Sequence, residues 1–214
     1  MIPFQILPIF MFSLDFVSAA KINITSPHLT NWGRWGSLQR CPSETYAQGF
    51  QLKTERYLYI DGDDTALNSI KLFCGDPTKQ GTPSITSTEG FFGVWGKVHT
   101  CFPGFLTGFQ LRVMPNAKGC GDGDNFAATN IRFFCTNGEL EGDGINLGNW
   151  GQAKYCGRNQ SICGIQTQVE AVQAKLDDTS LNNVLMECCD VPPTAPLIEW
   201  KPEDEQDYSS QPLT

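Results

Sequence analysis

Acidic side chains at matched positions offer the most direct chemistry in this sequence. Glu55 and Glu170 end two related stretches, GFQLKTE and GIQTQVE, and Asp64 and Asp178 lie in a second pair of related stretches. Two carboxyl groups about 5 to 10 Å apart can hydrolyse or transfer a glycosidic bond, because one protonates the leaving oxygen and the other acts as base or nucleophile. Glu55 and Glu170 are therefore the candidate catalytic pair.

The recurrence of these acids also has a structural explanation. A side chain that forms a turn is repeated in every copy of a repeated unit, and Asp and Asn both hydrogen-bond nearby backbone N–H groups. Asn125 stands where the other copies have Asp64 and Asp178, and this exchange preserves the turn-forming ability. We therefore favour turn formation over catalysis for these positions.

Clustered acids can also bind calcium, which prefers several oxygen ligands. DGDD begins at Asp61 and GDGDN at Gly121, but an EF-hand loop starting at Asp61 needs Glu at the position of Leu72. Zinc is disfavoured as well, because C-x-x-C pairs are missing and His28 and His99 stand apart. No metal and no cofactor are expected, and an irregular calcium site is the alternative.

Tryptophans are the third kind of candidate, since their flat apolar faces can stack on sugar rings. Trp35, Trp95 and Trp150 recur at equivalent positions, so packing in the interior or at the rim explains them better than binding. Trp32 occurs in one copy only and is the better candidate for contact. The predicted ligand-binding residues are Asn31, Trp32, Asp64, Asn149 and Asp178.

Three copies of one unit must position these residues. DDTALNSIKLFC (63–74) recurs as DNFAATNIRFFC (124–135) and DDTSLNNVLMEC (177–188), and each copy opens on a Trp-Gly pair six residues before a cysteine. The shared stretches alternate apolar and polar residues, which is the period of a half-buried strand, and 21 glycines interrupt any helical spacing. We predict an all-β body of three similar sheets that share one interior about a pseudo-threefold axis.

Nine cysteines indicate an oxidising compartment, where disulfides persist. The repeat predicts one disulfide within each copy: Cys41 to Cys74, Cys101 to Cys135 and Cys156 to Cys188. Cys189 points away from Cys188 on a strand, so it is expected to pair with Cys163, which has no counterpart. Cys120 is left unpaired, as a buried thiol or, less favoured, as a free thiol or a link to another molecule.

Composition divides the chain into a signal peptide (1–20), a folded domain (21–190) and an acidic, Pro-rich, disordered tail (191–214). The first segment is apolar and ends in small residues, whereas Pro8 and Asp15 interrupt the run of about 20 apolar residues that a membrane anchor needs. Asn23 and Asn159 begin glycosylation sequons. We therefore expect a secreted, extracellular, monomeric protein without a membrane partner. The net charge of −8 argues against nucleic acid as a partner.

The stretches NWGRWG, GFQLKTE, DDTALNSIKLFC and CGIQTQVE resemble the vitelline membrane outer layer protein family over roughly residues 24–191. The resemblance implies a β-prism of three four-stranded Greek-key sheets with pseudo-threefold symmetry. It also implies a secreted, disulfide-bonded protein of egg coats and other secretions. Association with glycan-rich layers and a weak transferase action on chitin-type oligosaccharides are ascribed to this family.

Two departures weaken a catalytic interpretation, because the second copy has Met114 where the family has Glu and Asp124-Asn125 where it has Asp-Asp. The leading hypothesis is a non-enzymatic structural protein that associates with extracellular glycans or glycoproteins. One alternative is a weak glycosyl transferase or hydrolase that acts on N-acetylglucosamine oligomers through Glu55 and Glu170. Another is a protein that binds a partner through its acidic tail.

Overall fold

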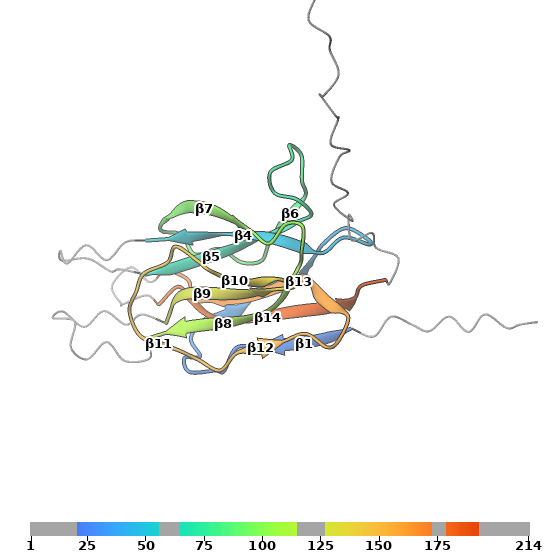
Figure 1. Ribbon diagram of the computed structural model, residues 1–214. Helices are drawn as coiled ribbons and strands as arrows, with labels where there is room; N and C mark the ends of the chain where they lie inside the picture. Colours follow the sequence, from blue (N-terminus) through green and yellow to red (C-terminus); the bar gives the residue numbers. More distant parts are fainter. Residues whose placement is uncertain (1–20, 56–64, 115–126, 173–178, 193–214) are drawn as a thin grey trace, which may run out of the picture.

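The computed structural model describes residues 21–55, 65–114, 127–172 and 179–192, which form fourteen β-strands and no helix. The strands form three antiparallel sheets around a shared interior (Figure 1). The predicted all-β fold is confirmed. Within the described ranges, no helix is long and apolar enough to cross a membrane. Several predictions lie outside the described residues: the signal peptide, Asp64, Asp178, Cys120 and residues 193–214 of the tail.

Sheet B shows the basic unit most simply. Its strands lie in the order β6-β5-β4-β7, so that the fourth strand along the chain returns beside the first, as in a Greek key. The bounds are β4 (Ala47–Thr54), β5 (Leu67–Cys74), β6 (Ser84–Thr86) and β7 (Val94–Thr100).

Sheets A and C repeat this arrangement with a fourth strand that is broken into two short pieces. Sheet C has the order β10-β9-β8-β11, with β12 also paired to β8. Its bounds are β8 (Leu106–Val113), β9 (Ala128–Cys135), β10 (Gly138–Glu141), β11 (Asn149–Trp150) and β12 (Lys154–Tyr155). Sheet A has the order β1-β14-β13-β2, with β3 also paired to β13. Its bounds are β1 (Ile22–Thr25), β2 (Arg34–Trp35), β3 (Gln39–Arg40), β13 (Gln160–Val169) and β14 (Leu181–Asp190).

The sheets do not coincide with the copies defined by the sequence. Trp95 opens the second copy, yet it lies on β7 and pairs with Lys53 of β4 in sheet B. Trp35 likewise pairs with Gln168 of the last copy, so the first described strands complete the sheet that contains the last strand. Each sheet is therefore closed by the Trp-Gly segment of the following copy, and the ring closes where the first described strands pair with the last ones.

Apolar residues on the inner faces of all three sheets form one core. Phe50 of β4, Phe109 of β8 and Phe133 of β9 are fully buried, and the rings of Phe50 and Phe133 lie 4.6 Å apart. Aliphatic side chains fill the remaining interior: Leu52, Ile70, Leu72, Leu111, Ile131, Ile165, Val184 and Met186. Burial of this many apolar side chains is the main stabilising contribution, at about 1.5 to 3 kcal/mol for each.

Four disulfides have the pairing that the sequence predicts, but three of them join different sheets. Cys41 follows β3 of sheet A and bonds Cys74 of sheet B, whereas Cys101 follows β7 of sheet B and bonds Cys135 of sheet C. The bond from Cys156 to Cys188 joins sheets C and A. Each of these three disulfides lies within one sequence copy, as predicted, and it joins two sheets because the edge strands are exchanged between neighbouring sheets.

The recurring tryptophans lie on the outer faces of the sheets and not in the interior. The Lys71 ammonium lies 3.9 Å from the Trp95 ring centre, and the Arg132 guanidinium lies 4.8 Å from that of Trp150. Trp35 is 36% exposed. The rings of Trp95 and Trp150 therefore pack against cationic side chains on the outside of the prism, whereas the ring of Trp35 lies beside that of His28.

Candidate functional site

The carboxylates of Glu55 and Glu170 close two equivalent hairpins. Oε2 of Glu55 accepts hydrogen bonds from the backbone N–H (3.1 Å) and the hydroxyl (2.7 Å) of Thr65. Oε2 of Glu170 accepts the same pair from Thr179, at 3.1 and 2.6 Å. We call the end of the prism where these hairpins lie the hairpin end, and the opposite end, with Cys74, Cys135 and Cys188, the disulfide end. In both hairpins, one carboxylate oxygen is thus hydrogen-bonded to the threonine that begins the second half of the hairpin.

A chain of buried polar groups links the two hairpins. The Ser180 hydroxyl of sheet A donates to Oδ1 of Asn68 in sheet B at 2.8 Å, and Asn68 donates to the hydroxyl of Thr65 at 2.7 Å. The Glu170 N–H donates to the carbonyl of Ser180. Glu55 and Glu170 thus lie at the same end of the molecule and are connected through other residues.

The third hairpin keeps the backbone arrangement without the carboxylate. Met114 N–H donates to the Ala127 carbonyl, as Glu55 N–H donates to the Ala66 carbonyl. Because the hairpin forms with methionine at this position, the acid is a brace that two of the copies carry and not a requirement of the fold.

A covering segment, residues 26–33, crosses the hairpin end of sheet A on a network of amide groups. Nδ2 of Asn183 donates to the Thr30 carbonyl at 2.7 Å and to Oε1 of Gln168 at 2.8 Å. Gln168 Nε2 in turn donates to Oδ1 of Asn31 at 3.3 Å, and the Trp32 N–H donates to Oδ1 of Asn182 at 3.2 Å. Asn182 and Asn183 are almost completely buried. The network therefore fixes the backbone of a surface segment from beneath.

Trp32 lies on this fixed segment and is 44% exposed. Asn31 beside it is also exposed, and the buried Oγ1 of Thr30 has no hydrogen-bond partner among the described residues. An aromatic face on a rigid backbone with amide groups beside it is suited to a ligand that is apolar on one side and hydroxylated at its edge. The structure thus brings together the predicted residues Asn31 and Trp32.

The predicted residue Asn149 lies elsewhere. It is exposed on β11 and pairs with Val113 in sheet C. Asn149 is the sheet C counterpart of Arg34, because each follows a glycine that packs on the end of the central strand. It therefore belongs to a different face of the prism from Trp32.

Three glycines that the sequence analysis did not single out set the conformation of these segments. Gly33, Gly93 and Gly148 have φ values of 81°, 82° and 77°, a region that residues with a side chain rarely adopt. A Cβ on Gly33 would lie 2.2 Å from the backbone of Val169. The sequence contains a sign of these glycines, because a glycine stands two residues before the tryptophan in NWGRWG, FFGVWG and NLGNWG.

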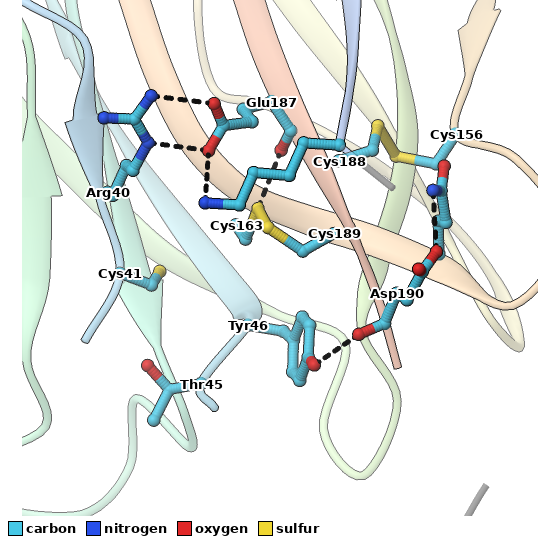
Figure 2. The surroundings of a disulfide bond; sticks show 12 residues. Arg40, Cys41, Thr45, Tyr46, Cys156, Cys163, Glu187, Cys188, Cys189 and Asp190 are labelled. Atoms are coloured by element: carbon cyan, nitrogen blue, oxygen red, sulfur yellow. Dashed lines mark hydrogen bonds and ion pairs between the residues drawn. A yellow bond between two sulfur atoms is a disulfide. The ribbon is translucent and has the colours of Figure 1, made fainter. Parts of the chain in front are cut away.

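Sheet A also carries a charged cluster at the disulfide end (Figure 2). Arg40 donates to both carboxylate oxygens of Glu187, from Nε at 2.7 Å and from Nη2 at 2.9 Å, and Nζ of Lys21 lies 3.6 Å from Oε1. The hydrogen bond from Arg40 holds the pKa of Glu187 below its ordinary value, against the opposing effect of burial. This pair joins β3 to β14 across the central strand.

The sulfurs of Cys163 and Cys189 lie close to the Glu187 carboxylate, within the reach of a single metal ion. They are joined in the fourth disulfide, however, and the carboxylate is held by Arg40. Metal binding by cysteine requires free thiolates, so this cluster does not fit a metal.

The two predicted glycosylation sites are exposed. Asn23 lies on the edge strand β1 opposite Glu187, and Asn159 lies in the turn before β13 with φ 60°. Both positions leave the asparagine side chain accessible at the disulfide end of sheet A.

Three Greek-key sheets closed around one core define the class of this molecule as a disulfide-linked β-prism. A family model described as "Vitelline membrane outer layer protein I (VOMI)" matches residues 22–191, and the chain belongs to this family. The vitelline membrane outer layer protein 1 homolog of Mus musculus is 40% identical over 163 residues, which cover 74% of this chain and 78% of the relative. That of Homo sapiens is 39% identical with the same coverage.

Among solved structures, a prostate-specific glycoprotein lectin superposes with a TM-score of 0.51 and 10% sequence identity. The match covers 78% of this chain and 99% of the lectin. At this identity the likeness is one of fold, and it agrees with the β-prism that the sheets define.

Proposed function

We propose that this protein is a secreted structural component of an extracellular layer, such as an egg coat, and that it associates with glycans. The observation that carries the proposal is Trp32, an exposed aromatic side chain on a segment held rigidly by Asn182, Asn183 and Gln168. A rigid aromatic surface loses little conformational entropy when a sugar ring stacks on it.

The family and the fold support a role of this kind. Relatives at about 40% identity are named for the vitelline membrane outer layer. A lectin with the same prism shows that this fold accommodates a protein of the lectin class. The signal peptide predicted at residues 1–20 and four disulfides support secretion.

The bonding of Glu55 and Glu170 favours the structural hypothesis over the glycosyl transferase. Each carboxylate accepts two hydrogen bonds from a threonine at the base of its own hairpin. One oxygen of each carboxylate is therefore occupied by the hairpin, whereas a catalytic acid or base must reach a substrate with its proton-transferring oxygen.

An array of immobilised mannose, galactose, N-glycan and chitin-type oligosaccharides tests the proposal on the secreted protein. Trp32 precedes Gly33, and Leu147 precedes the equivalent glycine of sheet C, Gly148. The substitution Trp32→Leu therefore introduces a residue that the third copy already has at this position, so the fold should tolerate it. We expect the unsubstituted protein to bind a subset of the glycans, and Trp32→Leu to weaken this binding about tenfold.

A matched control separates a specific contact from general loss of apolar surface. Phe91 is 79% exposed in the connection between β6 and β7, and Phe91→Asn introduces the residue of the equivalent positions Asn31 and Asn146. This variant should bind as the unsubstituted protein does. Absence of binding to every glycan, or equal binding by Trp32→Leu, would refute the proposal.

A further inference from the structure

A glycine in the central strand of each sheet lets the neighbouring edge strand approach closely. These glycines are Gly49, Gly108 and Gly164. A Cβ on Gly108 would lie 2.5 Å from the Lys154 carbonyl oxygen and 2.9 Å from Cδ1 of Tyr155. On Gly164 it would lie 3.0 Å from the Gln39 carbonyl oxygen and 3.2 Å from Cβ of Glu187. Side chains from the two flanking strands can therefore meet above each glycine.

The side chains that meet above the glycine differ between the sheets. In sheet A they are Arg40 and Glu187, which form the ion pair of Figure 2. In sheet C they are Tyr155 and Phe134, whose ring centres lie 4.6 Å apart at an interplanar angle of 33°. The position that holds an ion pair in sheet A therefore holds a pair of aromatic rings in sheet C.

Tyr155 remains 56% exposed although its ring packs on Gly108 and Phe134. One side of the ring is held by the sheet, and much of the rest faces solvent. Glu139 lies opposite Phe134 in the pairing of β10 with β9, and its side chain is 55% exposed. Sheet C therefore presents a braced aromatic ring in the same row of residues as a carboxylate, and Nη1 of Arg132 lies 3.6 Å from that carboxylate.

We propose that Tyr155 forms a second sugar-binding surface on sheet C, so that one molecule binds two glycan chains and cross-links them. The proposal rests on the proposed function and deepens it. A pyranose ring can stack its C–H face on the tyrosine, while the exposed Glu139 carboxylate, which pairs with Arg132, has acceptor capacity left for hydroxyls further along the glycan.

The size and polarity of the surface favour a sugar over a protein partner. A stable protein interface buries about 800 Å² on each side around an apolar centre. Tyr155 is the one large hydrophobic side chain on the strands of sheet C that is exposed, and two charged residues are near it in the chain, Lys154 directly before it and the exposed Arg158 three residues after it. One exposed ring with a polar surround has the dimensions of one monosaccharide.

The two surfaces are too far apart to bind one sugar. Tyr155 pairs with Gly108, near the disulfide end of sheet C, whereas Gly33 beside Trp32 packs against Val169 at the hairpin end of sheet A. Gly108 lies five residues before the end of its strand, which corresponds to about 17 Å along the strand direction. The two surfaces also lie on different faces of the prism.

Cross-linking of a polyvalent glycan tests this inference. The glycan that binds most tightly on the array is attached in many copies to soluble polyacrylamide, and precipitation of the polymer is followed by turbidity. Tyr155→Thr introduces the residue of sheet B at the same position, Thr100, which lies opposite Gly49. The unsubstituted protein should precipitate the polymer, whereas Tyr155→Thr and Trp32→Leu should each bind it without precipitation.

Affinity measurements distinguish the two proposals. The double variant should lose binding, and Tyr155→Phe, which keeps the aromatic ring, should precipitate the polymer as the unsubstituted protein does. If Tyr155→Thr still precipitates the polymer, or if a stoichiometry of one glycan per protein is measured, the second surface is refuted while the proposed function stands. Absence of all binding would refute both. Near-ultraviolet circular dichroism checks that each variant is folded.

Discussion

Single residues differ between the three copies mainly where side chains face solvent. The residue before the positive-φ glycine of each copy (Gly33, Gly93 or Gly148) is Trp32, Phe92 or Leu147. The side chain above the central-strand glycine is Arg40 in sheet A and Tyr155 in sheet C. Core positions, in contrast, are mostly apolar in every sheet, although Thr167 replaces Leu52 and Leu111 at one of them. Packing constrains the interior residues similarly in all three sheets. Differences between the copies at exposed positions therefore indicate residues that contact other molecules.

The ion pair of Arg40 and Glu187 should make stability depend on pH in the acid range. The pKa of Glu187 is lowered in the folded protein, chiefly by the hydrogen bond from Arg40. The stabilisation is therefore complete above the pKa of an unfolded glutamate, about 4.3, and is lost as the pH falls through the lower folded-state value. Arg40→Met should lower the free energy of unfolding at pH 7 by about 1 to 2 kcal/mol, a range reduced because Arg40 is half exposed.

Urea unfolding at several pH values measures this effect without added salt. The difference between Arg40→Met and the unsubstituted protein should shrink once the pH falls below about 4. Glu141→Gln is the control, because this carboxylate pairs with Arg132 but is 43% exposed, so its loss should cost less than about 1 kcal/mol. A loss that is equal at all pH values would show that Arg40 acts through packing alone.

Two β-hairpins are stabilised by the acidic residues Glu55 and Glu170. In β4–β5 and in β13–β14, the glutamate, the threonine and an asparagine form the same chain of hydrogen bonds. Ala66 and Ser180, the residues after these threonines, have φ values of 56° and 50°. The carboxylate thus holds a backbone turn that is unfavourable for residues with a side chain. Turn formation, which the sequence analysis favoured for the acids, agrees with this bonding.

Glu55→Met gives the β4–β5 hairpin the residue that the β8–β9 hairpin has at the equivalent position, Met114. The Thr65 N–H and hydroxyl lose their acceptor, so we expect the free energy of unfolding to fall by about 1 to 2 kcal/mol. Met114→Glu is the matched control, because Phe126 precedes Ala127 there and offers no hydroxyl. Its effect should be below about 0.5 kcal/mol. Thermal and urea unfolding measure both, and no change in Glu55→Met would argue against the bracing role.

The described part of the molecule is a ring of three sheets whose first and last strands pair in sheet A. β1 pairs with β14, and Ile22 lies opposite Cys188, so the first and last described strands are neighbours (Figure 1). Three disulfides join the sheets in a cycle, A to B, B to C and C to A. Cooperativity should therefore extend over the entire prism, because no sheet is complete without residues from a neighbouring copy.

A circular permutant tests this closure. A short flexible linker would join Val191 to Lys21, and new ends would be placed in the exposed connection 78–81 between β5 and β6. We expect the permutant to fold with all four disulfides and to unfold in one transition, within about 2 kcal/mol of the unsubstituted protein. Disulfide mapping and urea unfolding check this result. Deletion of residues 21–40 should instead abolish folding, because sheet A then lacks three strands.

The sequence alone determined the strand type, the threefold repeat and the pairing of the cysteines. These features depend on local alternation and on spacings that recur along the chain, such as the six residues from Trp35 to Cys41. Only the tertiary structure decided which copy each edge strand completes, because hydrogen bonding between strands depends on spatial neighbours and not on order along the chain. It also decided that the tryptophans face outwards and that Trp32 rests on buried amides from β14. Those contacts join residues about 150 positions apart, as between Trp32 and Asn182, and no local pattern encodes them.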